Sequence, residues 1–146
     1  MLEITGDLWT IPADWRGITT NGDVKTNGAC VMGRGCALEA KTRYIGLDRI
    51  LGRLIQEHGN HVFILGAGLI SFPVKHHWRN PADINLIRQS AHELADITDA
   101  GKIGGLILLP HPGCGNGGLN WSDVRPVLNT ILDDRFTVTT FESKGA

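Results

Sequence analysis

Apolar and polar residues follow two different spacings along the chain. Alternating apolar residues, and short apolar runs bounded by Gly, Asn or Asp, predict β-strands, whereas apolar residues three and four apart predict helices. The strand patterns lie within residues 2–9, 17–20, 61–65, 69–74, 106–109 and 136–141. In the first of these segments, the strand is expected to end at residues 6–7. The helical patterns cover residues 36–44, 47–55, 80–100 and 124–131. This alternation predicts the α/β class, with helices covering a mixed sheet.

Turn and cap residues add detail at two places. Residues 66–68 (GAG) form a turn between two strands that are expected to be buried, and so predict a hairpin. At the start of the third helix, Asn80 is expected as the N-cap, Pro81 at the first helical position and Asp83 in the first turn. The buried stripe of that helix is expected to hold Ile84, Ile87, Ala91, Leu94 and Ala95.

Length and composition limit the domain organisation. The chain has 146 residues, of which 42% are hydrophobic and 20% charged, values typical of one globular domain with a sizeable core. We therefore expect a single domain over residues 1–146. The net charge of -1 excludes a global positive field that would draw the whole surface to nucleic acid. No signal-peptide or membrane-span pattern is visible, so we expect a cytoplasmic protein without membrane contact.

The cysteines carry no disulfide or metal signal. They are Cys30, Cys36 and Cys114. Their odd number and the absence of a CxxC pair predict reduced thiols, and no metal-ligand spacing is visible. Cysteines beside glycines are more often small packing residues. A Cys–His nucleophile remains the alternative, because the chain also contains His76, His77 and His111.

Two glycine-rich segments are the main functional signal. Residues 28–35 precede one expected helix, while residues 110–121 follow the apolar run at 106–109 and precede another helix. Glycine lets backbone approach a ligand closely, and N–H groups at a helix start favour phosphate. Ligands of open α/β sheets bind outside the carboxyl ends of strands, so both segments are expected to flank one diphosphate. Each segment alone is compatible with a structural turn, and neither contains a P-loop or a complete dinucleotide fingerprint.

These motifs resemble those of the macrodomains that bind ADP-ribose. Residues 5–8 (TGDL) are similar to the first-strand signature of that family, Asn21 with residues 31–35 (VMGRG) to its first loop, and residues 113–121 (GCGNGGLNW) to its second. The resemblance spans nearly the whole chain. It implies a three-layer fold, with a central mixed sheet and helices on both faces, and ADP-ribose as the ligand.

The resemblance also implies roles for individual residues. Asp7 would accept a hydrogen bond from the adenine amino group, and Asn21 would lie near the distal ribose as part of the catalytic set. Without the resemblance, Asp7 is a turn residue and Asn21 starts an Asx-turn. Phe141 is a further candidate to stack near adenine. The expected ligand-binding residues are Asp7, Leu8, Val31, Met32, Gly33, Arg34, Gly35, Gly113, Cys114, Gly115, Asn116, Gly117, Gly118 and Leu119.

Residues 72–79 (FPVKHHWR) extend the likeness to the branch that contains the antitoxin macrodomain of bacterial DNA ADP-ribosylation systems. In that branch a lysine at this place is tied to glycohydrolase activity, which implies Lys75 as the catalytic residue. A partly desolvated lysine can act as nucleophile or base, or stay charged and stabilise a developing anion, and the sequence leaves these roles open. The second loop has no carboxylate, in contrast to some lysine-using macrodomain hydrolases.

The implied reaction is hydrolysis of the glycosidic bond between the distal ribose of ADP-ribose and its acceptor. Residues 75–79 combine cationic and titratable groups with Trp78, a combination that suits the rim of a single-stranded nucleic-acid site. We therefore expect ADP-ribosylated DNA as the substrate, with RNA or protein as alternatives, and neither a cofactor nor a metal. A DNA ADP-ribosyltransferase toxin is the implied candidate partner.

Two other functions remain compatible with the glycine-rich segments. A reader module would bind ADP-ribose in the same clamp without cutting it. A small NAD-dependent dehydrogenase would use the segments for a dinucleotide, but the fingerprint is incomplete and there is no room for a separate substrate domain.

Overall fold

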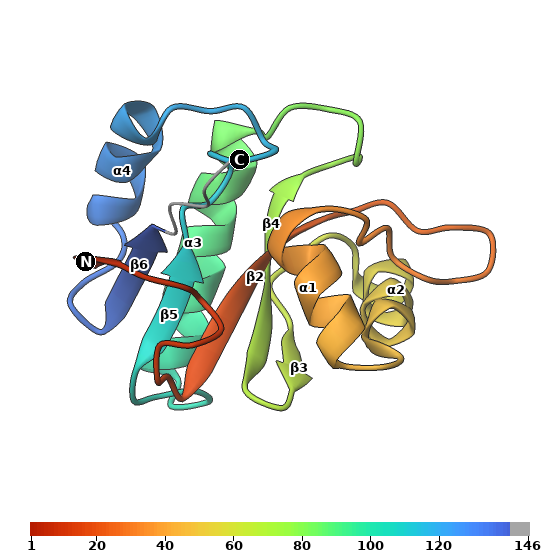
Figure 1. The fold of residues 1–146 in the computed structure, drawn as a ribbon, viewed down its shortest axis with the longest axis horizontal. Coiled ribbons are helices and arrows are strands. Elements are labelled where there is room, and N and C mark those ends of the chain that lie inside the picture. Colours follow the sequence, from red (N-terminus) through yellow and green to blue (C-terminus); the bar gives the residue numbers. More distant parts are fainter. Residues whose placement is uncertain (141–146) are drawn as a thin grey trace.

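The computed structural model describes residues 1–140, in which a six-stranded sheet lies between two helical layers (Figure 1). The strands are β1 (Leu2–Thr5), β2 (Trp15–Asn21), β3 (Ile64–Gly66), β4 (Leu69–Lys75), β5 (Ile107–Pro110) and β6 (Phe136–Thr140). The helices are α1 (Gly35–Arg43), α2 (Leu47–His58), α3 (Ile84–Asp99) and α4 (Trp121–Asn129). The predicted α/β class is therefore confirmed.

The sheet is mixed, and two of its central strands diverge. The strand order is β1-β6-β5-β2-β4-β3, and all neighbours are parallel except β3 and β4. β2 pairs with β4 from Arg16 to Asn21, but it pairs with β5 only at Trp15 and Arg16. Figure 1 shows β2 and β5 close together at their amino ends and apart at their carboxyl ends. In α/β sheets, ligands bind at such a divergence of strand ends.

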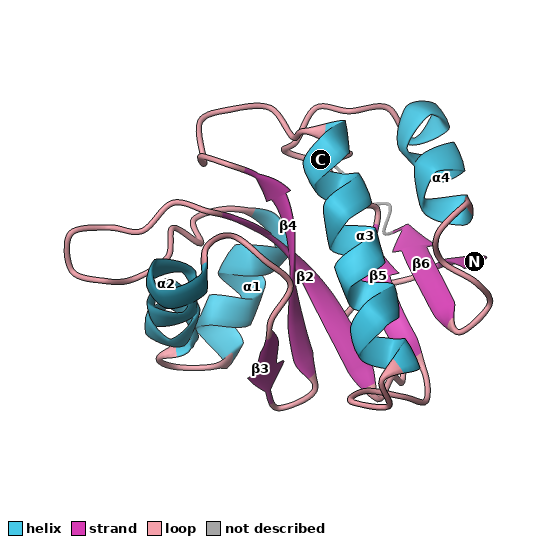
Figure 2. Cartoon of the chain, turned by 180° about the vertical axis from the view of Figure 1, so that it is seen from behind, coloured by secondary structure: helices cyan, strands magenta, loops and turns pink. Residues whose placement is uncertain are grey.

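The two faces of the sheet carry separate hydrophobic clusters. On one face, Phe72, Leu109 and Phe136 are buried against Ile87 and Leu94 of α3. Figure 2 shows this face, with α3 in front of the sheet and α4 beside it. On the other face, a second cluster joins α1 and α2 to β2 and to the start of β4. Each fully buried Leu, Ile or Phe side chain contributes roughly 2 kcal/mol to folding, so these clusters hold the carboxyl ends of the strands in place.

The hairpin of β3 and β4 is confirmed, but the expected buried strand at 61–65 is wrong in extent. The turn uses positive φ angles at Gly66, Ala67 and Gly68. β3 begins only at Ile64, which is 40% exposed at the edge of the sheet. The preceding N–H of Phe63 donates to the side chain of Ser71 at 2.8 Å. Before Ile64 the two segments are joined by this side-chain contact and by one backbone bond, from the N–H of Ser71 to the carbonyl of Phe63 at 2.9 Å, rather than by a regular ladder.

The start of α3 differs from the expected one. The expectation of Asn80 as N-cap and Pro81 at the first helical position is wrong, because the helix begins at Ile84. Asp83 is the N-cap, and its Oδ1 accepts a hydrogen bond from the N–H of Asn85 at 2.8 Å. The carboxylate expected inside the first turn therefore stands one position before the helix.

Other element ends shift by a few residues. The buried face of α3 holds Ile87, Ala91 and Leu94 as expected, but Ile84 and Ala95 are only half-buried, and Leu86, Ser90 and Thr98 complete the stripe. Leu106 lies before β5 and is exposed, while β2 is longer than residues 17–20 and α4 begins at Trp121. The expected stacking residue Phe141 and the expected frayed end at 143–146 lie outside the described residues.

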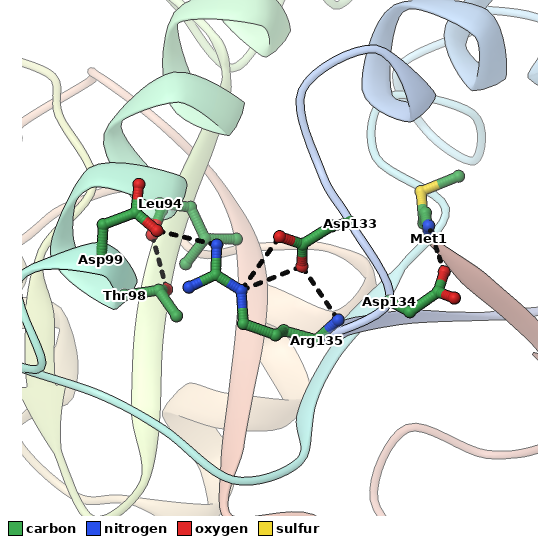
Figure 3. Close-up of polar contacts among 7 residues, drawn as sticks. All are labelled: Met1, Leu94, Thr98, Asp99, Asp133, Asp134 and Arg135. Carbon is green, nitrogen blue, oxygen red and sulfur yellow. Dashed lines mark hydrogen bonds and ion pairs between the residues drawn. The ribbon is translucent and has the colours of Figure 1, made fainter.

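Ion pairs lie at the end of the molecule opposite the diverging strand ends. Figure 3 shows Arg135, at the start of β6, between Asp133 and Asp99 of α3. Its guanidinium lies 2.8 Å from Asp99 and 2.9 Å from Asp133. These carboxylates raise the pKa of Arg135. The N-terminal amine of Met1 pairs with Asp134 at 2.9 Å.

Candidate active site

A cleft of about 450 Å³ opens where β2 and β5 diverge. Three connections border it: the β2–α1 connection (residues 22–34), the β4–α3 connection (residues 76–83) and the β5–α4 connection (residues 111–120). The predicted site residues on its walls are Asn21, Val31, Met32, Gly33, Arg34, Gly35, Lys75, Gly113, Gly115, Asn116 and Gly117. The structure thus brings both glycine-rich segments to one cleft, and their roles toward a ligand stay predictions.

Asn21 anchors the first wall of the cleft. Its Nδ2 donates to the carbonyl of Val31 at 3.0 Å, and its Oδ1 accepts from the N–H of Asp23 at 2.9 Å. The second contact is the Asx-turn that the residue type alone predicts. The first contact holds Val31, which lines the cleft, against the end of β2. Asn21 therefore shapes the wall in addition to standing in it.

The glycines of the first wall leave space. A Cβ added at Gly33 would meet nothing within 4 Å. Gly35 adopts a φ of +58° and lies opposite Asn116, whose Nδ2 would be 3.1 Å from an added Cβ. The N-cap of α1 is Arg34, which makes no side-chain cap hydrogen bond. The first N–H groups of α1 therefore have no side-chain acceptor at this cap, a situation that favours an anion.

The second wall is built from backbone contacts. The N–H of Leu119 donates to the carbonyl of Gly113 at 2.9 Å, and the N–H of Gly118 donates to Gly115 at 3.2 Å. An added Cβ at Gly117 would lie 2.4 Å from the carbonyl oxygen of Gly113. Three of the predicted residues, Cys114, Gly118 and Leu119, do not line the cleft, and Cys114 and Leu119 pack against the core beside α3 and α4. Cys114 and Leu119 therefore support the wall from the core side, whereas Gly118 is exposed.

Lys75 stands at the end of β4, opposite Asn21 in the β2–β4 register. Its carbonyl accepts hydrogen bonds from the N–H of Gly22 at 3.2 Å and from Nδ2 of Asn60 at 3.1 Å. Its Nζ donates to the carbonyl of Trp78 at 3.3 Å. Desolvation in the cleft, and secondarily the positive charge of Arg34, lower the pKa of Lys75. The neutral amine is therefore more accessible than in an ordinary surface lysine.

Asp7 and Leu8 do not line the cleft formed by the described residues. Oδ1 of Asp7 accepts from the N–H of Trp9 at 2.9 Å, which is the local turn that a Gly-Asp pair predicts. Leu8 is buried, and its carbonyl accepts from Nε of Arg16 at 2.8 Å. The adenine-binding role of Asp7 stays a prediction.

The cleft also contains residues outside the predicted set. They are Thr19, Thr20, Cys36, Ala37, Val74, Trp78, Pro110 and His111. All but Trp78 and Pro110 lie within two positions of a predicted residue, so extending each motif by two positions would have found the other six. The Sγ of Cys36 accepts a hydrogen bond from the N–H of Thr19 at 3.3 Å. Thr19 lies in the part of β2 that no longer pairs with β5, so Cys36 takes the place of a strand partner there.

Burial disfavours the charged forms of His111 and of the three cysteine thiols. His111 stacks on Trp121 with ring centroids 4.0 Å apart, and its Nε2 lies 2.8 Å from Oγ1 of Thr140. Burial lowers the pKa of His111. Burial also raises the pKa of the Cys30 thiol to about 12 and that of Cys114 to about 11, and it raises the pKa of Cys36. A nucleophilic cysteine needs a thiolate, so the Cys–His alternative has no support here.

The described part of the chain holds neither a metal-ligand cluster nor a membrane-spanning helix. Residues 1–140 contain no group of three or more His, Cys, Asp or Glu side chains placed to hold a metal ion. Within the same residues, no helix has the length and hydrophobicity needed to span a lipid bilayer.

Comparison with known proteins finds relatives that carry the same name, DNA ADP-ribosyl glycohydrolase. No protein-family model matches the chain. The DNA ADP-ribosyl glycohydrolase of Mycobacterium tuberculosis is 31% identical over 104 residues, which are 64% of this chain and 29% of that protein. The chain thus corresponds to less than a third of this relative's length.

Solved structures cover nearly the whole chain. The macrodomain of Mycobacterium tuberculosis DarG superposes with a TM-score of 0.78 at 26% identity, covering 97% of this chain and 98% of the other. Thermosipho africanus DarTG in complex with ADP-ribose gives a TM-score of 0.76 at 22% identity, covering 97% of this chain and 41% of the other. The chain therefore has the fold of a macrodomain, and in fold and sequence it is similar to the macrodomains of the DarG proteins.

Proposed function

We propose that this chain binds ADP-ribose in the cleft between β2 and β5 and hydrolyses the glycosidic bond that joins the distal ribose to a DNA base. The observation that carries the proposal is the placement of Lys75 beside Asn21, on paired strand ends, in a cleft whose other walls are two glycine-rich segments. The relatives named DNA ADP-ribosyl glycohydrolase and the DarTG complex with ADP-ribose support it.

The diphosphate is proposed to lie between Gly33 and Gly35 on one side and Gly115 to Gly117 on the other. All of these residues line the cleft, and Gly33 and Gly115 leave open space where a Cβ would otherwise stand. Backbone N–H groups of glycine-rich turns and of a helix start are suited to phosphate oxygens. The cleft volume of about 450 Å³ lies within the usual range for small-molecule sites.

Lys75 is proposed to act at the anomeric carbon of the distal ribose. In the reaction, the bond from this carbon to the base breaks, a bond to a water oxygen forms, and the departing base takes up a proton. The lowered pKa of Lys75 allows its amine to serve as nucleophile or base, and its charged form allows it to stabilise the departing base. Asn21 lies beside it and is proposed to orient the ribose.

The rim of the cleft supports a nucleic acid as the acceptor. Trp78 lines the cleft and is 46% exposed, and the guanidinium of Arg79 lies 5.8 Å from its ring centroid. An exposed aromatic ring beside cations suits stacking on an unpaired base next to a phosphate. Arg34 adds a further positive charge to the cleft wall. Because the net charge is only -1, this local rim is proposed to supply the attraction.

Substitution of Lys75 by Ala tests the proposal. Wild-type protein is expected to release free ADP-ribose from modified single-stranded DNA, and Lys75→Ala is expected to be slower by roughly 10²- to 10⁴-fold. The variant should still bind free ADP-ribose in calorimetry. Lys102→Ala, which changes an exposed lysine outside the cleft, is the control.

The same assay separates the competing functions. ADP-ribosylated RNA and protein, offered in parallel, report on the acceptor. Binding of ADP-ribose without release from any of the three would make the chain a reader. Binding of NAD without binding of ADP-ribose would contradict the proposed ligand.

A DNA ADP-ribosyltransferase is the proposed partner in the cell, because some enzyme must attach the group that this chain removes. We propose that the chain acts in the cytoplasm as an antitoxin-like domain against such a transferase. Co-expression tests this: growth inhibition by a DNA ADP-ribosyltransferase should be relieved by the wild-type chain and not by Lys75→Ala. Equal relief by both would indicate sequestration rather than hydrolysis.

A further inference from the structure

We infer that Asp23 is a positioning residue, which fixes the turn at residues 75–78 and thereby places the ammonium of Lys75 and the indole of Trp78 at the mouth of the cleft. The inference rests on the proposed function, since it concerns the orientation of its catalytic lysine. Asp23 itself does not line the cleft. It belongs to the β2–α1 connection, 55 residues away from Trp78 along the chain.

The carboxylate of Asp23 holds the β4–α3 connection from outside. Its Oδ2 accepts from the N–H of Trp78 at 3.3 Å, and its Oδ1 lies 3.7 Å from Nδ1 of His77. From inside, Nζ of Lys75 donates to the carbonyl of the same Trp78 at 3.3 Å. One peptide segment is thus fixed on both sides, and the direction of the Lys75 side chain depends on where that segment lies.

The backbone of Asp23 is itself fixed to the cleft wall. Its N–H donates to Oδ1 of Asn21 at 2.9 Å, and its carbonyl accepts from the N–H of Val31 at 2.9 Å. Asn21 is in turn the register partner of Lys75. Asn21 contacts Asp23, Asp23 contacts Trp78, and Trp78 contacts Lys75. The β2–β4 pairing of Lys75 with Asn21 closes these contacts into a ring around the mouth of the cleft.

The position of the ring indicates a role in the site rather than in global stability. The side chain of His77 is 64% exposed, and the whole stretch at 76–80 is exposed. Exposed connections of this kind open locally without unfolding the core. Loss of the Asp23 carboxylate is therefore expected to loosen the turn while the two hydrophobic clusters stay intact. A catalytic group displaced by about 1 Å can lose roughly 10²-fold in rate.

The chain contains a matched control for Asp23. Glu93 on α3 also accepts from one backbone N–H, that of Val62 at 2.9 Å, and contacts one imidazole, Nδ1 of His61 at 2.7 Å. None of these three residues lines the cleft. Glu93→Ala therefore removes the same kind of contact from a place where no effect on the reaction is expected.

The test compares Asp23→Ala, Asp23→Asn and Glu93→Ala. We expect Asp23→Ala to lower kcat for ADP-ribose release by about tenfold or more, while the Kd for free ADP-ribose stays within about twofold of wild type. Asp23→Asn keeps an acceptor oxygen for the Trp78 N–H, so its kcat should stay within about threefold of wild type. The amide of Trp78 should exchange with solvent faster in Asp23→Ala and at the wild-type rate in Glu93→Ala.

Other outcomes overturn the inference. An unchanged kcat in Asp23→Ala would show that the ring does not position Lys75. An equal loss of kcat and of ADP-ribose affinity, or an equal defect in Asp23→Asn and Asp23→Ala, would assign the effect to the ligand pocket or to the charge. A wild-type protein that releases no ADP-ribose would contradict the proposed function instead. Trp78 amide exchange then decides the inference alone, and equal rates in wild type and Asp23→Ala would overturn it.

Discussion

The β2–α1 and β5–α4 connections both leave the carboxyl end of a parallel strand, border the same cleft and lead into a helix. The first connection is held by the side chains of Asn21 and Asp23 in addition to backbone bonds, and it rests on α2, where the N–H of Cys30 donates to the backbone carbonyl of Asp48 at 2.8 Å. Backbone groups hold the second connection, through hydrogen bonds among its own glycines and from the N–H of Ala82 to Gly117 at 2.9 Å.

The two connections also contain two uses of glycine that look alike in the sequence. In the β5–α4 connection, Gly117 is needed because the backbone of Gly113 and the side chain of Ala82 leave no room for a Cβ. In the β2–α1 connection, Gly33 has open space around it and an ordinary φ. The first kind of glycine builds the wall, and the second kind leaves room for what the wall holds.

The largest effect is expected from Gly117→Ala. An added Cβ would lie 2.4 Å from the carbonyl oxygen of Gly113 and 2.8 Å from Cβ of Ala82. Because neither neighbour is the flexible end of a long side chain, the backbone must move, and we expect the free energy of unfolding to fall by about 3 kcal/mol. Urea titration measures this as a lower midpoint with an unchanged m-value. A midpoint equal to that of wild type would show that the second connection yields as easily as the first.

Gly33→Ala is the counterpart and is expected to separate stability from binding. No atom lies within 4 Å of the added Cβ, so the free energy of unfolding should change by less than about 0.5 kcal/mol. The methyl group would stand in the space proposed for the diphosphate, and the affinity for ADP-ribose should fall about tenfold, or about 1.4 kcal/mol. Calorimetry with ADP-ribose checks the affinity. If stability falls and affinity does not, the two glycines do not differ in the way proposed.

Local patterns predicted the parts of the fold that depend on continuous apolar runs. β4, β5 and β6 bury nearly every side chain; β5 is apolar throughout, β4 is apolar except for Ser71 and Lys75, and β6 is rich in Thr. The convergence of both glycine-rich segments on one cleft was also predictable, because parallel strands end at the same edge of the sheet. Neither inference required knowledge of any contact between distant side chains.

Distant contacts explain what the sequence could not predict. Asn80 and Pro81 carry the local signals of a helix start, yet the N–H of Ala82 is used by Gly117 and that of Asp83 by Val74. These two hydrogen bonds hold the segment against the β5–α4 connection and β4, so the helix begins only after Asp83. The contact between Asp23 and Trp78 is of the same kind, since no spacing along the chain indicates it.

The smallest expected effect concerns the charge that the first connection places beside Lys75. Desolvation lowers the pKa of Lys75 first, and repulsion from Arg34 lowers it further. Arg34→Met removes only the repulsion, so the pKa of Lys75 should rise and the limb of the pH–rate profile that it governs should move to higher pH. The direction is the same for both forms of the lysine: a rate that needs the neutral amine rises at a higher pH, and a rate that needs the ammonium persists to a higher pH.

Arg53→Met, which removes an exposed charge on α2 away from the cleft, should leave the limb in place. A limb that stays in place or moves down in Arg34→Met would show that the first connection acts on Lys75 through geometry alone, and not through its charge.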